Sequence, residues 1–225
     1  MPQPPLPPFD RTVPKGLGRR RVLGWLGMLA AWLPLLAARP IRAQPQPSAA
    51  ARTTPAQTEG PFYPVSLPAD TDGDLLRQGG DAYAKGQPCW LDGQVRDASG
   101  QPLAGAVVEI WQCDADGHYR HPGDGNRADP TFQAFGRVQA DSQGRYRFRT
   151  IRPVAYSGRT PHIHVKVKLG RRTLLTTQLY VAGDPGNAQD FLWRRLSDAD
   201  RAVLTVSFQP VADGLRAGFD IVVAA

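Results

Sequence analysis

The sequence predicts an all-β protein, a β-sandwich of about seven to nine strands with long loops around its functional site. From Trp90 onward, short runs rich in β-branched and aromatic residues alternate with turn signals. The turns contain Gly, Pro, Asp and Ser, and no long segment repeats its apolar residues with helical spacing. Several short strands without intervening helices are typical of two packed sheets.

Seven runs are expected to form strands: Trp90–Asp97, Ala106–Cys113, Arg145–Ile151, His162–Leu169, Thr173–Val181, Val203–Phe208 and Phe219–Val223. A turn near Gly100-Gln101 separates the first two, which predicts that they form a hairpin. One segment, Asp190–Arg201, is expected to be a helix, with Asp190 or a neighbouring residue as its N-cap.

Cys89 and Cys113 lie at the outer ends of the first two expected strands. In a hairpin that is symmetric about residue 101, these two residues face each other at a distance that suits a disulfide. A disulfide between them is one expectation, and a buried free Cys113 is the alternative.

Residues 1–43 have the features of an export signal. Arg19-Arg20-Arg21 precede Val22–Ala38, an uncharged apolar run of 17 residues, and small residues follow near Ala43. The arginines followed by Val22-Leu23 are similar to a twin-arginine signal, whose pathway carries folded proteins. We expect cleavage after Ala43 and a periplasmic or secreted protein without a stable membrane anchor. A retained anchor is the alternative, although the run is shorter than the ~20 residues of a typical span.

The rest of the chain divides into a short linker and one domain. Residues 44–57 are rich in Pro and Ala and are expected to be flexible, and residues 58–225 form the expected sandwich domain. Seven of the 27 basic residues and one of the 20 acidic residues lie in residues 1–43, which leaves a net charge of only +1 elsewhere. A nucleic-acid partner is therefore not expected, because the surplus of basic residues belongs to the export signal.

His162 and His164 are the strongest candidates for metal ligands. Alternate side chains of a strand point to the same face, so both imidazoles can bind one metal ion. Tyr156 lies in a turn-prone loop six residues before His162 and can fold back over that face. A His-x-His pair can also be purely structural, so the neighbouring residues determine whether it indicates a metal site.

A second candidate segment follows the expected strand Ala106–Cys113. A turn at Asp116-Gly117 brings Tyr119 and His121 out on one side and His118 on the other. His118 and His121 are rival ligand candidates, and Tyr119 can equally be a packed tyrosine. The spacing alone does not choose among them.

Together these segments resemble the intradiol ring-cleavage dioxygenases, the family of protocatechuate 3,4-dioxygenase and catechol 1,2-dioxygenase. The resemblance runs from about Thr58 to Phe208 and consists of separate motifs in the same order: Thr58–Tyr63, Gly93–Asp97, Gly105–Gln112, Gly117–His121, Arg147–Pro153, Arg159–His164 and Thr177–Tyr180. It implies a transthyretin/Ig-like sandwich that holds one non-haem Fe(III) per chain. It also implies that both atoms of O₂ enter a catechol-type diol, which gives a cis,cis-muconate-type product.

The resemblance implies four iron ligands: Tyr119, Tyr156, His162 and His164. Tyr156 resembles the ligand that leaves the metal when substrate binds, and Arg159 and Gln178 resemble the pair that steadies the substrate. These three are the implied catalytic residues. Thr58 and Pro61 resemble residues that line the substrate pocket together with Arg159 and Gln178. Two tyrosines suit a ferric ion, because a hard cation prefers anionic oxygen and displaces the proton of a phenol that it binds.

The resemblance has two departures. The loop between Tyr156 and His162 is shorter than in protocatechuate 3,4-dioxygenase and lacks the tryptophan that follows the matching tyrosine there. The choice among catechol, protocatechuate and hydroxyquinol as substrate therefore stays open. No long helical region precedes the sandwich, so the dimer contact of the catechol 1,2-dioxygenases is not expected, although another oligomer stays open.

Two other interpretations keep the sandwich and change its function. Gly93–Asp97 with Gly100–Ala106 also resembles transthyretin-like modules that serve as non-catalytic binding or spacer domains. Such a module needs neither the Tyr119 motif nor the His162-x-His164 pair. A cupin-like metal site would need a further glutamate and a third histidine, whereas Lys166 and Lys168 occupy the next positions on the same face of the strand.

Overall fold

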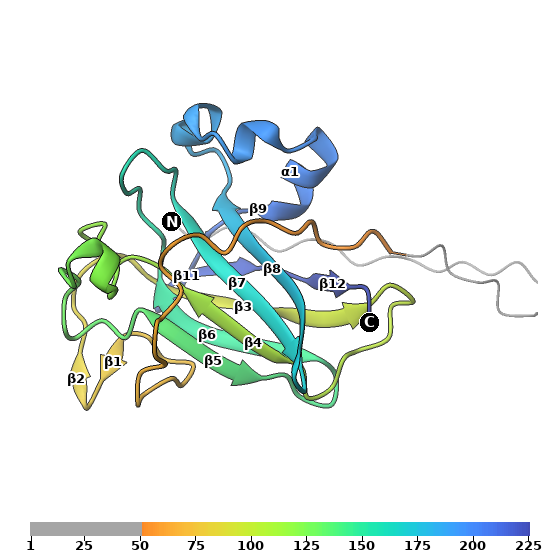
Figure 1. Cartoon of the computed structure of the whole chain (residues 1–225), viewed down its shortest axis with the longest axis horizontal. Coiled ribbons are helices and arrows are strands. Elements are labelled where there is room, and N and C mark those ends of the chain that lie inside the picture. Colours follow the sequence, from red (N-terminus) through yellow and green to blue (C-terminus); the bar gives the residue numbers. More distant parts are fainter. Residues whose placement is uncertain (1–50) are drawn as a thin grey trace, which may run out of the picture. The chain divides into compact units, whose positions relative to one another are not determined.

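The computed structural model describes residues 51–225, so the predicted export signal and the first part of the linker lie outside it. The described residues form two five-stranded sheets and a two-stranded hairpin (Figure 1). The prediction of an all-β sandwich is confirmed. No helix in this part of the chain is long and apolar enough to cross a membrane.

The first sheet is built around β3 (Pro88–Asp97), which pairs antiparallel with β6 (Arg145–Ile151). β11 (Gly214–Gly218) pairs in parallel with the first part of β3, and β12 (Ile221–Val223) pairs in parallel with its last residues. β10 (Gln209–Val211) extends the sheet beyond β11. The separate hairpin consists of β1 (Arg77–Gln78) and β2 (Asp81–Ala82).

The second sheet contains five strands in this order: β5 (Phe135–Gln139), β4 (Val107–Trp111), β7 (His162–Leu169), β8 (Arg172–Val181) and β9 (Thr205–Val206). The two sheets enclose one apolar core, in which Leu91 and Phe148 of the first sheet and Ile110, Ile163 and Val165 of the second are fully buried. The second sheet therefore has one face in the core, and its opposite face is available for a site.

The expected hairpin between the first two strands is wrong, because β3 and β4 belong to different sheets. Cys89 pairs in register with Thr150 of β6, while Cys113 follows the end of β4. Both cysteines are buried and free, so the disulfide prediction is wrong and the free-thiol alternative is confirmed. Burial raises the pKa of each thiol to about 12, which makes both thiols unreactive near neutral pH.

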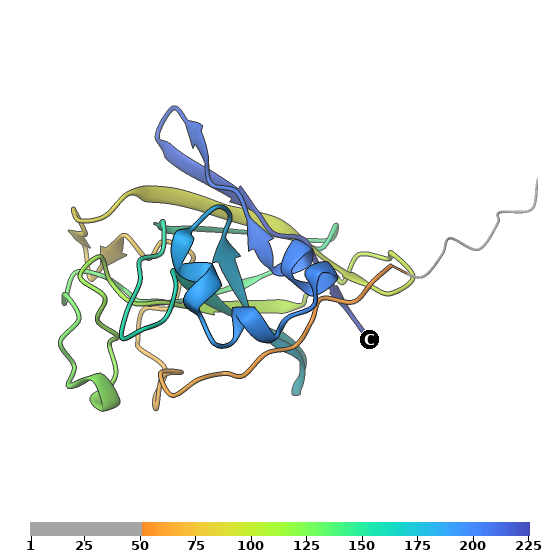
Figure 2. The same ribbon diagram turned by 90° about the horizontal axis from the view of Figure 1, so that it is seen from above.

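The expected helix Asp190–Arg201 is wrong and is replaced by shorter elements. After the 3-10 helix η2 (Pro185–Gln189), residues 193–195 form a second one, η3 (Trp193–Arg195). α1 (Asp198–Leu204) begins only after Ser197, whose hydroxyl accepts a hydrogen bond from the N–H of Asp200. These segments lie beside β9 (Figures 1 and 2), and α1 takes up the start of the run that was expected to be a strand from residue 203.

An N-terminal segment, residues 51–68, runs along the second sheet, and we call it the strap. The N–H of Thr54 donates to the carbonyl of Val222 in β12, and the N–H of Gln57 donates to that of Thr176 in β8. The hydroxyl of Tyr63 then donates to the buried carboxylate of Glu109 in β4, at 3.0 Å. The described part of the predicted linker is thus packed, and the strap covers the outer face of the second sheet (Figures 1 and 2).

Candidate active site

β7 supplies two histidines to the outer face of the second sheet. His162 pairs in register with Tyr180 of β8, and His164 pairs with Gln178. Both imidazoles are 1% exposed, and their Nε2 atoms lie 3.2 Å apart. The Nδ1 atom of His162 lies 2.7 Å from the carbonyl oxygen of Thr160, which can only accept. That nitrogen therefore carries the proton, and Nε2 offers a lone pair to a ligand.

Both histidines are held in their neutral form. Burial lowers the pKa of His162 to about 4, and the positive charge of Arg159 acts in the same direction. Burial also holds the pKa of His164 well below its usual value. Neutral imidazole is the form that binds a metal ion, so both side chains are ready to act as ligands without losing a proton.

The loop after β4 places Tyr119 beside the histidines. Its backbone N–H donates to the carboxylate of Asp124, which follows in the same loop, at 2.8 Å. The side chain is 2% exposed, and its ring centroid lies 6.1 Å from that of His164. The Tyr119 hydroxyl is buried and has no hydrogen-bond partner among residues 51–225.

The loop before β7 places Tyr156 on the other side of the site. The loop folds back through Ser157 at φ +36° and Gly158 at φ +75°, and Tyr156 and Arg159 form an isolated bridge across this turn. The Tyr156 ring centroid lies 4.9 Å from that of Tyr119 and 5.4 Å from that of His162. The structure therefore brings together all four predicted ligands.

This arrangement fits a ferric ion. Burial raises the pKa of Tyr119 well above its usual value, and burial also raises the pKa of Tyr156. Without a bound cation both phenols stay protonated, and the unpaired Tyr119 hydroxyl carries a desolvation cost. Two phenols and two neutral imidazoles with converging lone pairs are the donor set that a hard trivalent cation would deprotonate and bind.

The rival ligands have other contacts. The Nδ1 atom of His121 accepts a hydrogen bond from the N–H of Gly123, and the Nδ1 atom of His118 lies 3.8 Å from the Asp124 carboxylate. Both histidine side chains therefore make contacts within the loop that carries Tyr119. In the part of the chain that the structure describes, no three His, Cys, Asp or Glu side chains gather into a metal site, so the cupin-like alternative lacks its further ligands.

Arg159 and Gln178 form a hydrogen-bonded pair at the edge of the site. The Nη2 atom of Arg159 donates to the Oε1 atom of Gln178 at 2.7 Å. Arg159 also forms an ion pair with Asp190, in which Nε donates to Oδ2 at 2.7 Å. The sequence prediction named the first two residues but missed the third, because Asp190 was expected to cap a helix.

Two aromatic walls were also missed by the sequence analysis. The Trp111 ring stacks on His164, with centroids 4.8 Å apart and an interplanar angle of 8°. The Phe62 ring stacks on Tyr119 at 4.5 Å and 21°. Trp111 lies within the predicted strand Ala106–Cys113 and is the register partner of His164, so correct pairing of that strand would have identified it.

The strap contributes the predicted pocket residues in unequal ways. Thr58 is exposed, and its carbonyl oxygen accepts a hydrogen bond from the Nε2 atom of Gln178 at 3.1 Å. Pro61 is exposed on the same segment. Between them Gly60 has φ +72°, and a Cβ atom there would lie 3.2 Å from Cε1 of His164. The strap backbone therefore closes directly over one of the candidate ligands.

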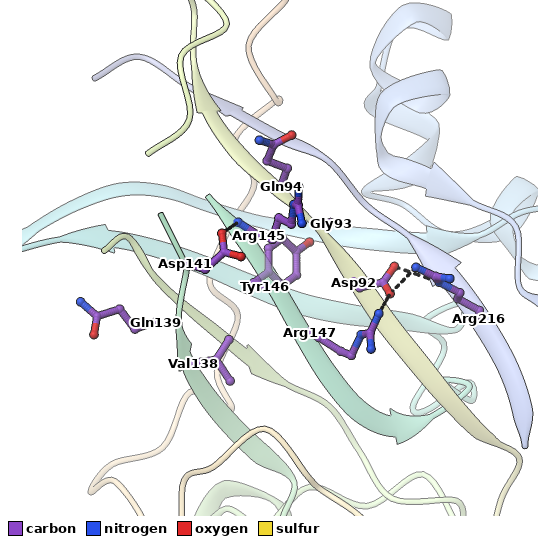
Figure 3. Close-up of a pocket in the computed structure, with 10 residues that line it drawn as sticks. All are labelled: Asp92, Gly93, Gln94, Val138, Gln139, Asp141, Arg145, Tyr146, Arg147 and Arg216. Atoms are coloured by element: carbon purple, nitrogen blue, oxygen red, sulfur yellow. Dashed lines mark hydrogen bonds and ion pairs between the residues drawn. The ribbon is translucent and has the colours of Figure 1, made fainter. Parts of the chain in front are cut away.

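Two cavities differ in their relation to this site. One of about 360 Å³ adjoins it, and its wall includes Phe62, Trp111 and Tyr119. A larger one of about 500 Å³ shares none of the site residues (Figure 3). There the Asp92 carboxylate forms ion pairs with Arg147 and Arg216, at 3.2 and 2.8 Å.

Comparisons with known proteins agree with this geometry. Residues 58–225 match the family described as dioxygenase. The chain is 35% identical over 182 residues to the protocatechuate 3,4-dioxygenase beta chain of Burkholderia cepacia, covering 72% of this chain and 75% of that one. It is 32% identical over 177 residues to a catechol 1,2-dioxygenase of Pseudomonas sp. (strain EST1001), covering 71% of this chain and 57% of that protein.

A solved structure with the same fold supports the assignment. The dioxygenase domain of a dioxygenase and carbohydrate-binding protein fusion from Streptomyces sp. SirexAA-E superposes with a TM-score of 0.62 at 31% identity. The match covers 77% of this chain and 99% of that one. The family match spans the whole of the predicted domain, strap residues included from Thr58 onward. This chain belongs to the intradiol ring-cleavage dioxygenases.

Proposed function

We propose that the chain binds one ferric ion through Tyr119, Tyr156, His162 and His164 and uses O₂ to cleave a catechol between its two hydroxyl-bearing carbons. The observation that carries this proposal is the convergence of two buried neutral imidazoles with two phenols, one of which has no other partner. When bound, the ferric ion supplies Lewis acidity and draws electron density from a catecholate. Both oxygen atoms of O₂ enter the ring, which opens to a cis,cis-muconate-type diacid.

The two tyrosines have different tasks. Tyr119 is almost fully buried and its backbone is tied to Asp124, so it suits a ligand that stays in place. Tyr156 is half-buried on a turn, and the charge of Arg159 lowers the pKa of its phenol against the larger opposing effect of burial. We assign to the Tyr156 phenolate oxygen the role of a base: it would help to hold the ferric ion and would take a proton from the catechol.

Charge balance supports this exchange. A catecholate dianion in place of two monoanions, the Tyr156 phenolate and a hydroxide, would leave the net charge of a ferric site unchanged in these largely buried surroundings. Arg159, whose side chain is 10% exposed, can donate hydrogen bonds to the substrate oxygens as negative charge develops on the ring. Gln178 holds one side of that guanidinium, and the carbonyl of Thr58 in the strap in turn holds the Gln178 amide.

Oxygen uptake by the purified iron-loaded chain tests the reaction. Relatives are named for protocatechuate, catechol and hydroxyquinol, so these three diols form the panel. We expect uptake of O₂ with at least one of them and a diacid that contains both oxygen atoms when ¹⁸O₂ is supplied. Absence of uptake with every diol would contradict the proposal and favour the non-catalytic sandwich.

We further propose that the chain is exported in folded form and acts outside the cytoplasmic membrane. The support is the run Arg19-Arg20-Arg21 before Val22–Ala38, and a metal loaded before export is protected from competing ions outside. Cell fractionation should find a soluble form that begins near Gln44. Changing the three arginines to lysine should block export, because the receptor reads paired guanidinium groups; unaffected export would contradict this.

A further inference from the structure

Asp190 is a fully buried carboxylate that lies behind Arg159. Its Oδ2 atom accepts from Nε of Arg159 at 2.7 Å and from the backbone N–H of Thr160 at 3.1 Å. Its Oδ1 atom accepts from the backbone N–H groups of Leu192 and Trp193, at 2.9 and 3.0 Å. Four donors on two oxygen atoms fix the carboxylate, so it can hold a charged partner in one orientation.

The guanidinium of Arg159 is held from three directions. Asp190 binds Nε, the Oε1 atom of Gln178 accepts from Nη2, and the ring centroid of Phe191 lies 5.4 Å from Cζ. Gln178 is itself fixed, because its Nε2 atom donates to the carbonyl of Thr58. The hydrogen bonds of the guanidinium to Asp190 and Gln178 use Nε and Nη2, and the guanidinium also lies beside the phenols of Tyr156 and Tyr180.

Asp190 also stabilises the positive charge of Arg159 against burial. Burial alone would lower the pKa of this guanidinium, but the hydrogen bond and the charge of Asp190 outweigh burial, and the pKa is raised. Arg159 in turn acts on the site, since its positive charge lowers the pKa of Tyr156 against the larger effect of burial. A cation with a 10% exposed side chain thus keeps its charge beside the phenol.

We propose that Asp190 is a positioning residue of the ring-cleavage reaction. It does not touch the substrate; it fixes the orientation of Arg159 so that this guanidinium can donate hydrogen bonds to the substrate oxygens. This inference rests on the proposed function. It predicts that the carboxylate is needed for turnover although it contacts none of the four candidate metal ligands.

Asp190→Asn in the full iron-loaded chain tests the proposal. Asparagine keeps the size and an oxygen that can cap Leu192 and Trp193, but it removes the charge that binds Arg159. We expect unchanged iron content, because Asp190 contacts none of the four ligands. Turnover of the best diol should fall at least about tenfold. The upper limit is the ~10²–10³-fold loss that is typical of removing a charge-stabilising donor.

Asp184→Asn is the matched control. Asp184 also lies at the η2 segment and caps it, since its Oδ1 atom accepts from the N–H of Gly186 at 2.9 Å, but it has no contact with Arg159. This variant should keep the turnover of the parent. Equal losses in both variants would show that disturbance of the loop, and not the carboxylate at residue 190, lowers the activity.

A double variant separates positioning from a structural role. Adding Asp190→Asn to Arg159→Ala should cause no further loss of turnover, because Asp190 acts through the guanidinium. A further loss would overturn the proposal, as would turnover of the single Asp190→Asn variant within twofold of the parent.

Crystal structures of the two single variants test the positioning role of Asp190 even if the parent cleaves no catechol. In the Asp190→Asn protein we expect the guanidinium of Arg159 to leave Gln178, whereas in the Asp184→Asn protein it should keep that contact. An unmoved guanidinium in the Asp190→Asn protein would overturn the positioning role independently of the proposed function.

Discussion

Gly60 is the strap residue whose backbone lies beside His164, a candidate iron ligand. Its φ of +72° is a conformation that L-residues with a side chain rarely adopt, and a Cβ atom would lie 3.2 Å from Cε1 of His164. Both features require glycine. An added methyl group would therefore require the His164 imidazole, which stacks on Trp111, to shift by a few tenths of an ångström.

Gly60→Ala should therefore weaken iron binding as well as folding. We expect a loss of about 1–2 kcal/mol in stability from the left-handed backbone, with a reduced iron content caused by pressure on His164. Gly79→Ala is the control, because Gly79 has φ +57° and no atom lies within 4 Å of its added Cβ. Metal analysis measures the iron content of the two variants, and urea unfolding measures their stability. Equal iron content in the two variants would contradict a contact between residue 60 and His164.

At this scale the sequence identified the residues that belong to local motifs. The period-two spacing of a strand was enough to place His162 and His164 on one face, whereas the roles of Tyr119 and Tyr156 came from the family resemblance. Asp190 was beyond reach because its function depends on a loop that returns to Arg159 from 31 positions further along the chain. No local pattern distinguishes such a carboxylate from an ordinary cap.

β7 is the element on which the site depends, and its two histidines make its stability sensitive to pH. Burial lowers the pKa of His162 to about 4 and holds that of His164 well below its usual value, so the folded chain binds fewer protons than the unfolded chain below about pH 6.5. The stabilisation from keeping them neutral is present above that pH. It is lost as the pH falls toward 4.

The metal-free protein should therefore lose stability between pH 6.5 and 4, with a slope of up to about 1.4 kcal/mol per pH unit for each histidine. Urea unfolding at several pH values measures this slope. His162→Gln, which cannot titrate, should have a shallower slope than the parent. Identical slopes would show that the buried histidine is not the titrating group.

Strand prediction failed where local composition and tertiary pairing disagree. β5, β10 and β11 each contain Gly or Pro, yet they pair with neighbouring strands of the two sheets despite their weak β-propensity. The short turn near residue 100 suggested a hairpin, but the chain crosses there from one sheet to the other. A pairing choice of this kind depends on the apolar faces of both sheets, which no single turn encodes.

At the scale of the whole domain, the site is assembled from several separate elements. Tyr119 and Tyr156 come from the loops that follow β4 and β6, and the histidines come from β7. The strap covers these side chains and is hydrogen-bonded to both β12 and β8. The repeated short strands predicted the sandwich correctly. The strap was expected to begin as a flexible linker, because its Pro- and Ala-rich composition does not reveal that Thr54 and Gln57 find backbone partners.

The visible absorption spectrum of the iron-loaded chain tests the central claim most directly. If Tyr119 and Tyr156 bind Fe(III), the protein has a tyrosinate-to-iron charge-transfer band that shifts when catechol is added without oxygen. His162→Ala, which removes a ligand that no neighbouring side chain replaces, should lose both the iron and the band. Iron bound at full strength without a visible band, or an unchanged band in His162→Ala, would contradict the account.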